Sequence, residues 1–361
     1  MKINKLLSIL ALSAIIFTSC SKEDSPLLPK GDYENGILIS GEGSPSAGTG
    51  SVSYVSNDLT TTENLIYKKA NSEELGTFLQ SMAFDDNRAF IIVDNQNTIS
   101  VVNRYTFKKE SAITVGLQTP RYMTIVGNKG YVTNWGSGSF GDNVSDDFIS
   151  IVNLETYEVE SKIDVAVGPE RILAHDGKLY VSHKGGFGMN NKISIIDIAT
   201  SKVVKEITVN DIPDEIFIDN NNFLVVLCEG KAAWTGNETL ASITRINTTN
   251  NTIESKIEFA NGMHPSLMVL DNTTAYYSVG NSVYKMNISD TELPTTEFLT
   301  ISLFTTGGFA SFYGMAVKDD KFYALNTRFS DISELQVFNL SDKKQIKTVE
   351  APIGASKIYF N

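Results

Sequence analysis

Apolar residues along this chain come in short runs, each bounded by polar turns, and one arrangement of these runs recurs. Its clearest copy has runs at 121–126, 130–133, 148–153 and 159–167, with the turn 127–129 between the first two. A proline marks the start of four successive copies, at spacings of 49, 44 and 52 residues: Pro120, Pro169, Pro213 and Pro265. Four short strands repeated at this period are typical of a propeller blade.

The number of copies predicts how the ring closes. Six full copies follow from Met82 onward, and an incomplete opening copy at 36–67 lacks a first strand. Residues 357–360 have the sequence of that missing strand. We therefore predict an all-β fold, a seven-bladed β-propeller over 31–361 with four-stranded blades, whose C-terminal strand closes the N-terminal blade and removes a free edge. A β-sandwich or an open β-solenoid would explain the regular copies less well.

The N-terminal residues indicate export. Lys2 and Lys5 precede an apolar segment at 6–17 that is too short for a membrane span and is typical of a secretory signal. The residues that lead into Cys20 resemble the bacterial lipobox, which implies that Cys20 is lipidated and becomes the mature N-terminus. An ordinary signal peptide with an incidental cysteine is the alternative.

These features divide the chain into a signal peptide over 1–19, a lipidated cysteine with a flexible tether over 20–30, and the propeller. The cluster 22–24, a lysine followed by two acidic residues, resembles the signal that sends lipoproteins of Bacteroidetes to the cell surface. We therefore expect a lipid-anchored protein of the outer membrane that is exposed on the cell surface.

Charge and cysteine content narrow the range of partners. The net charge of −12 argues against nucleic acid, because binding to phosphates needs a basic surface. No later stretch has the length to span a bilayer, so the lipid anchor is the expected link to the membrane. The second cysteine, Cys228, lies in the apolar run 223–228, where we expect it to be a small buried hydrophobic residue.

Candidate binding residues gather on one predicted face. In a four-stranded blade, the connection between the second and third strands opens on the same face as the start of the first strand. These connections vary widely between copies and are rich in glycine and aromatic residues, which suits a large amphipathic small molecule. The alternative is that the rings only fill gaps between blades. The candidate ligand-binding residues are Trp135, Phe140, Phe187, Trp234, Arg121, Arg171, His183, Lys184, His264, Tyr313 and Arg328.

Signals for catalysis are weak. The sequence contains no G-x-S-x-G elbow, no P-loop and no H-E-x-x-H motif. The three histidines share no metal-ligand spacing: His175, His183 and His264. We therefore expect a protein that is not an enzyme and that carries no resident cofactor.

Two groups of carboxylates are candidates for chemistry. Glu170 and Asp214 stand at the starts of blades and could act as a general acid and base. Two carboxylates at such positions are not a specific signal of catalysis. Asp142, Asp146 and Asp147 could gather around a calcium ion in the long loop of the third blade. A solvated acidic turn is the favoured interpretation of that cluster, so no metal site is assigned.

The repeat resembles a known family. Residues 168–171 ahead of a first strand, and the pattern I-S-I-[IV]-[DN] at 149–153 and 193–197, look like the YncE-like propellers. Together with the lipobox and the cluster 22–24, this repeat is similar to the surface lipoproteins of Bacteroidetes that cap TonB-dependent transporters. Among these it resembles the cobalamin-capture proteins of the BtuG type.

That resemblance implies a non-catalytic protein that captures cobalamin or another corrinoid, as a ligand rather than a cofactor, and passes it to a TonB-dependent outer-membrane transporter. The aromatic residues expected to stack on or flank the macrocycle are Trp135, Phe140, Phe187 and Trp234. The residues expected to hydrogen-bond to its amides and phosphate are Arg121, Arg171, Lys184 and Arg328. His183 and His264 could offer an imidazole to a metal-bearing ligand. A ferric siderophore or a protein partner remains an alternative, and a propeller lactonase or lyase is less favoured.

Overall fold

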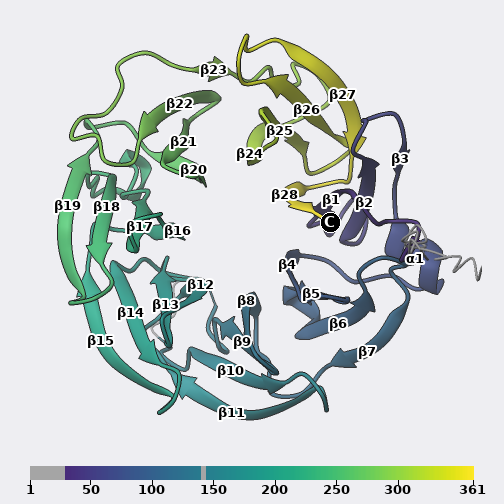
Figure 1. Ribbon diagram of the computed structural model, residues 1–361, viewed down its shortest axis with the longest axis horizontal. Helices are drawn as coiled ribbons and strands as arrows, with labels where there is room; N and C mark the ends of the chain where they lie inside the picture. Colours follow the sequence, from purple (N-terminus) through teal and green to yellow (C-terminus); the bar gives the residue numbers. More distant parts are fainter. Residues whose placement is uncertain (1–28, 140–143) are drawn as a thin grey trace, which may run out of the picture.

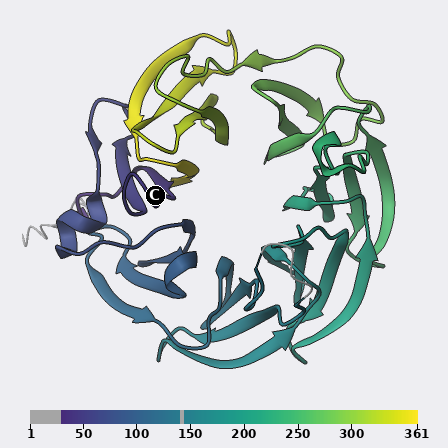
Figure 2. The same ribbon diagram turned by 180° about the vertical axis from the view of Figure 1, so that it is seen from behind.

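The computed structural model describes residues 29–139 and 144–361, which form seven four-stranded antiparallel sheets arranged in a ring (Figure 1). The view from behind shows the same closed ring around an open axis (Figure 2). The predicted seven-bladed β-propeller is therefore confirmed. The signal peptide and Cys20 lie outside the described residues, as do Phe140 and Asp142.

Six blades each use four consecutive strands, which run from the innermost to the outermost position. The second to fourth blades contain β4 (Leu79–Phe84), β5 (Arg88–Val93), β6 (Thr98–Asn103), β7 (Lys109–Ile113), β8 (Pro120–Val126), β9 (Lys129–Asn134), β10 (Phe148–Asn153), β11 (Glu158–Asp164), β12 (Pro169–His175), β13 (Lys178–His183), β14 (Lys192–Asp197) and β15 (Lys202–Thr208). The fifth to seventh blades contain β16 (Pro213–Ile218), β17 (Phe223–Cys228), β18 (Ser242–Asn247), β19 (Thr252–Glu258), β20 (Pro265–Asp271), β21 (Thr274–Val279), β22 (Ser282–Asn287), β23 (Leu299–Thr300), β24 (Ala310–Lys318), β25 (Lys321–Arg328), β26 (Ser333–Asn339) and β27 (Gln345–Ala351).

The first blade joins the two ends of the chain, as predicted. Its strands, from the axis outward, are β28 (Ala355–Phe360), β1 (Gly36–Gly41), β2 (Ser51–Ser56) and β3 (Thr62–Glu63). The Asn361 N–H donates a hydrogen bond to the Gly36 carbonyl at 2.8 Å. The Tyr359 hydroxyl accepts one from the Met82 N–H at 2.8 Å, which links this blade to the second. The closing strand therefore stabilises two blades at once.

The hydrophobic core is divided among the junctions between blades. Buried apolar residues of the described chain form seven clusters, each shared by two neighbouring blades. Successive residues of β17 alternate between two of them: Val225 and Leu227 pack toward the sixth blade, whereas Leu224, Val226 and Cys228 pack toward the fourth. Both faces of a middle strand are thus buried, which explains its continuous apolar sequence. Burial raises the pKa of the Cys228 thiol to about 12, so it remains a neutral core residue.

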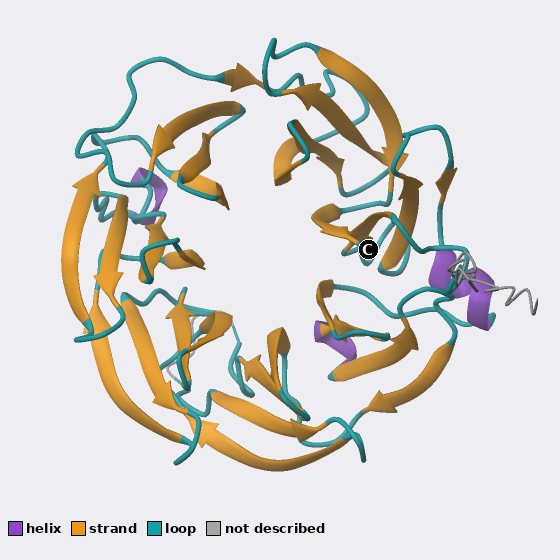
Figure 3. Cartoon of the chain, in the orientation of Figure 1, coloured by secondary structure: helices purple, strands orange, loops and turns teal. Residues whose placement is uncertain are grey.

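Helical structure is limited to short pieces (Figure 3). The helix α1 (Ile66–Asn71) follows β3 at the outer edge of the first blade, and the 3-10 turns η1 (Asp94–Gln96) and η2 (Ala233–Thr235) lie in connections between second and third strands. Among the helices that the structure describes, none combines the length and the apolar character needed to cross a membrane.

Candidate functional site

One face of the ring opens into a central cavity of about 710 Å³. We call this face the loop face, because it carries the connections between second and third strands at 42–50, 94–97, 135–139 with 144–147, 184–191, 229–241, 280–281 and 329–332. All seven blades contribute to the wall. The lining residues are Glu42, Phe78, Gln80, Asp94, Asn95, Thr119, Arg121, Tyr122, Trp135, Glu170, Arg171, Lys184, Phe187, Asp214, Glu229, Ser266, Leu267, Ser311, Phe312, Tyr313 and Lys357.

An irregularity at the start of each inner strand brings side chains to this cavity. In β8 the pairing with β9 shifts between Pro120 and Met123, and the inner strand of every other blade has a shift at the corresponding place. A bulge places two residues opposite one and breaks the strict alternation of a strand. Consequently Arg121 and Tyr122, although adjacent in sequence, both line the cavity.

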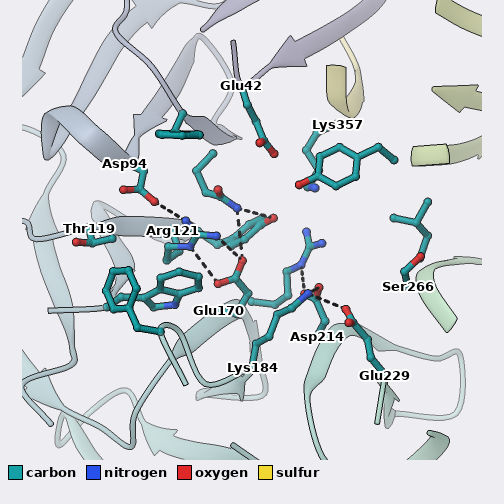
Figure 4. Close-up of a pocket in the computed structure, with 18 of the residues that line it drawn as sticks. Glu42, Asp94, Thr119, Arg121, Glu170, Lys184, Asp214, Glu229, Ser266 and Lys357 are labelled. Carbon is teal, nitrogen blue, oxygen red and sulfur yellow. Dashed lines mark hydrogen bonds and ion pairs between the residues drawn. The ribbon is translucent and has the colours of Figure 1, made fainter. Parts of the chain in front are cut away.

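A second position is equally regular. The first residue after the second strand of a blade faces the cavity in five of the seven blades: Glu42, Asp94, Trp135, Lys184 and Glu229. The side chains from these two positions converge from different blades, as Figure 4 shows. The cavity wall is therefore assembled from equivalent positions of a repeated unit.

Three cations of the wall, Arg121, Arg171 and Lys184, are held by carboxylates from neighbouring blades. Arg121 forms ion pairs with Glu170, at 3.1 Å from Nε to Oε2, and with Asp94 (Figure 4). Arg171 pairs with Asp214, at 2.9 Å from Nε to Oδ1, and with the adjacent Glu215. These pairs are largely desolvated, so the loss of either partner would leave an uncompensated buried charge.

Lys184 continues this network across the wall. Its Nζ atom lies 2.7 Å from Asp214 Oδ2 and 2.7 Å from Glu229 Oε1. Burial alone would raise the pKa of Asp214, but Lys184 and Arg171 outweigh it and hold that pKa well below its usual range. Burial dominates at Glu229 and raises its pKa to about 7, despite the attraction of Lys184. One buried carboxylate is therefore firmly ionised, and its neighbour titrates near neutral pH.

The aromatic residues of the wall are partly engaged by the protein itself. The Arg121 guanidinium lies 3.7 Å from the centroid of the Trp135 ring, and the Trp135 Nε1–H donates to the Pro169 carbonyl at 3.1 Å. Phe187 meets the same indole edge-on, with 5.4 Å between ring centroids. Because Arg121 covers one face of the indole, a ligand can reach only the remaining surface of Trp135, together with Phe187.

The structure brings six of the predicted residues together in the cavity wall: Arg121, Trp135, Arg171, Lys184, Phe187 and Tyr313. Three others lie outside it. Trp234 is 80% exposed on η2, beyond the rim. His264 hydrogen-bonds through Nδ1 to the Glu229 carbonyl at 2.8 Å. Arg328 binds the carbonyl of its own loop at Ile332, at 2.7 Å from Nη2, and covers the Phe304 ring.

The expectation that His183 offers its imidazole to a ligand is wrong. His183 is the last residue of β13 and is fully buried, with Nε2 at 2.8 Å from Ser194 Oγ. Burial lowers the pKa of its imidazole to about 4, so the ring is neutral at physiological pH. The last residue of the second strand is equally buried at Val93, Asn134 and Cys228. The side chain points into the blade rather than toward the cavity because of this strand position.

The acidic residues of the third-blade loop that the structure describes accept hydrogen bonds from other parts of the protein. Asp146 accepts hydrogen bonds from Ser137, at 3.0 Å from the backbone N–H and 2.6 Å from the hydroxyl. Asp147 accepts one from the Gly168 N–H, and burial raises its pKa to about 6. In residues 29–139 and 144–361, no group of three or more His, Cys, Asp or Glu side chains is placed to hold a metal ion.

Sequence reasoning missed several residues of the wall, notably Glu42, Asp94 and Lys357. A comparison between copies would have found them. Lys357 occupies in β28 the position of Arg171 in β12, two residues after the residue that opens the strand. Glu42 and Asp94 are each the first residue after a second strand, as Lys184 is.

The protein is a closed β-propeller with a polar cavity of ligand size at the centre of one face. The chain belongs to the DUF5074 family, described as a domain of unknown function, whose model matches residues 35–352. No curated protein matches the chain.

Similar solved structures share the fold. A functionally unknown protein from Desulfotomaculum acetoxidans has 14% sequence identity and a TM-score of 0.65, over 91% of this chain and 99% of that one. The computationally designed Ika8 protein has 9% identity and a TM-score of 0.57, over 92% of both chains. The dihydro-heme d1 dehydrogenase NirN has 11% identity and a TM-score of 0.56, over 92% of this chain and 76% of that one. Identities this low show a common fold alone.

Proposed function

We propose that this protein is a non-catalytic capture protein, which binds a large polar small molecule at the central cavity of the loop face. A corrinoid is the first candidate ligand, and a TonB-dependent outer-membrane transporter is the proposed recipient. The observation that carries the proposal is the cavity of about 710 Å³, whose wall combines aromatic rings with alternating cations and carboxylates. Such a wall offers donors and acceptors to a ligand that spans several blades.

The charge balance of the cavity favours a corrinoid over a ferric catecholate siderophore. Five carboxylates and four cations line the wall: Glu42, Asp94, Glu170, Asp214 and Glu229, against Arg121, Arg171, Lys184 and Lys357. A ferric catecholate carries a net negative charge, which needs an excess of unpaired cations. The amide groups around a corrinoid are neutral and can bind to ionised groups of both signs.

The network also supports a role in binding rather than catalysis. Glu170 is held by Arg121, and the low pKa of Asp214 keeps that carboxylate ionised and engaged with Lys184 and Arg171. Asp214 is therefore not free to exchange a proton near neutral pH. A lactonase or lyase is the second candidate function, because the pKa of Glu229, about 7, suits a general base.

We propose that the protein is anchored at the cell surface by lipid on Cys20, which rests on the lipobox-like sequence and the cluster 22–24. Cells that express the full chain and are fed a radiolabelled fatty acid should label the wild-type protein and leave Cys20→Ala unlabelled. Equal labelling of both proteins would exclude this anchor. Protease added to intact cells should degrade the wild-type protein if it is displayed on the surface.

Calorimetric titration with cyanocobalamin tests the ligand, using the chain that starts after Ser21. We expect one-to-one binding that Phe187→Ala weakens about tenfold, the effect of losing an aromatic contact of roughly 1.4 kcal/mol. Trp234→Ala is the matched control, because Trp234 is exposed outside the cavity wall. Trp135→Ala should also weaken binding, with its melting temperature measured because Trp135 supports Arg121.

The same titration separates the alternatives. The absence of heat with cyanocobalamin would exclude the corrinoid, and heat with a ferric catecholate would then make the siderophore the ligand. Equal losses in Phe187→Ala and Trp234→Ala would place binding outside the cavity. Turnover of a lactone substrate that is abolished by Glu229→Gln would replace the capture function with the enzymatic one.

A further inference from the structure

Below the central cavity, the axis of the ring continues into a second cavity of about 240 Å³, which we call the channel cavity. Tyr122, Arg171, Leu267 and Lys357 line both cavities and therefore mark the boundary between them. Apolar side chains form much of the remaining wall of the channel cavity: Met82, Phe217, Met268, Val269, Met315 and Ile358. Its volume suits one compact chemical group rather than a macrocycle.

The channel cavity has an excess of positive charge. Its ionisable lining groups, phenols aside, are the cations Arg171 and Lys357 and the carboxylate Glu215. Arg171 and Glu215 form an ion pair. Within the described residues, the Lys357 ammonium forms no ion pair within 4.0 Å, and the carboxylates of Glu215 and Glu42 attract its charge from a longer distance. Lys357 is thus the one cation among the lining residues of the two cavities that has no carboxylate in direct contact.

A hydroxyl group beside Lys357 also lacks a partner. Ser356 lines the channel cavity and is fully buried, and its Oγ atom forms no hydrogen bond within the described chain. Buried hydroxyls are almost always hydrogen-bonded, so an unpaired one needs an explanation. A hydroxyl can donate to an anion that an adjacent ammonium attracts. Ser356 and Lys357 are adjacent in β28, and both line the channel cavity, to which they offer a donor and a charge.

We propose that the channel cavity is a binding subsite for a single carboxylate or phosphate group, held by Lys357 Nζ and Ser356 Oγ. The largely apolar wall strengthens an ionic contact in this place, because the local dielectric constant is low. Burial and the nearby Arg171 lower the pKa of Lys357, and a bound anion would oppose that effect. The inference goes beyond the proposed function, since it concerns a separate cavity and makes no assumption about a corrinoid.

Thermal denaturation tests the subsite with simple anions. We expect the melting temperature of the wild-type protein to rise with increasing sodium phosphate or sodium acetate, relative to sodium chloride at equal ionic strength. Lys357→Met removes the charge, retains the chain length and should abolish the rise. Lys347→Met is the matched control, because Lys347 is exposed on β27 and loses the same charge far from the axis. It should retain the rise.

Two further measurements keep the proposal falsifiable. If Lys357→Met does not fold, Ser356→Ala replaces it, and its apparent anion affinity should fall at least threefold. Crystals grown with selenate should show an anomalous peak between Lys357 and Ser356. A response to phosphate alone would identify a phosphate subsite, and a response to acetate a carboxylate subsite.

The proposal is overturned by an equal rise in wild type and Lys357→Met, or by no rise with either anion. Titration with cyanocobalamin is a separate experiment. Its failure would not change the response to simple anions, and the failure of the anion response would not change that titration.

Discussion

Asp214, itself buried, binds Arg171 and Lys184 with its two carboxylate oxygens, and Asp214→Asn measures what this arrangement contributes to stability. The substitution keeps the shape of the side chain and removes its charge. Arg171 Nε and Lys184 Nζ then face a neutral amide in a buried setting, where they had contacted the carboxylate at 2.9 and 2.7 Å. Asparagine can accept through only one of its two terminal atoms.

The size of the effect follows from what the two cations retain. Removing one partner of a buried ion pair typically costs about 3–5 kcal/mol, because a charge is left uncompensated. Arg171 still contacts Glu215, and Lys184 still contacts Glu229. We therefore expect a loss at the lower end, about 3 kcal/mol of unfolding free energy. With a slope of about 3 kcal/mol per molar urea, the denaturation midpoint falls by about 1 M.

Urea denaturation followed by tryptophan fluorescence measures this loss, with Asp164→Asn as the control because Asp164 is exposed and has no recorded ion pair. The folded pKa of Asp214 is depressed, so its stabilising effect is present above the unfolded pKa of about 3.9 and is lost as the pH falls. The difference between wild type and variant should therefore persist from pH 8 to 5 and shrink below pH 4. A loss below about 1 kcal/mol at pH 7 would refute the reasoning.

Two further predictions concern Glu229 and the glycines of the fourth blade. The folded pKa of Glu229, about 7, is raised above its unfolded value, so this group lowers the unfolding free energy as the pH rises from about 4.5 to 7. In urea titrations across this range, Glu229→Gln should remove up to about 1.4 kcal/mol per pH unit from the dependence of unfolding free energy on pH. An unchanged dependence on pH would contradict the raised pKa of Glu229. Gly168 and Gly177 have nearly equal backbone angles, φ 71° and 72°, but a Cβ at Gly168 would lie 2.1 Å from the Gly185 backbone, whereas at Gly177 nothing lies within 4 Å. Gly177→Ala should therefore cost about 1 kcal/mol and Gly168→Ala at least about 3 kcal/mol by the same assay, and equal losses would show that the close approach has no energetic weight.

The fold could be predicted from sequence because its signal is repeated. A single run such as 223–228 fits a strand or a buried helix equally well, and only its recurrence between polar turns at a blade-like period decides the matter. Closure was predictable for the same reason, since the opening copy lacks a strand that 357–360 supplies. The signal of each single strand is weak, but its recurrence in every copy makes the topology predictable.

The site was only partly predictable. Residue type and loop position identified Trp135 and Phe187 as wall residues, but Trp234, chosen by the same criteria, lies exposed on a 3-10 turn outside the wall. The orientation of a loop depends on contacts between blades that a sequence does not display. The prediction for His183 failed for a different reason. Its position at the end of a strand, rather than the chemistry of histidine, determines that its side chain is buried.

The ion-pair network could not be derived from sequence alone. Glu170 contacts Arg121 although they are 49 residues apart, because one blade places its carboxylate beside the cation of the next. Which charges meet depends on the bulge that turns two adjacent residues toward the axis. Composition reports the charges and not their pairing.

The closing strand also determines the order of events in folding. The strand β1 gains its inner partner only from residues 355–360, about three hundred positions later in the chain. Closing so long a loop is entropically costly and is slow when many non-local contacts must form together. Until that step, the apolar segment Gly36–Gly41 presents an unpaired edge on which another chain can add a strand. A nascent chain of this protein is therefore most exposed to aggregation during the interval before its last residues arrive.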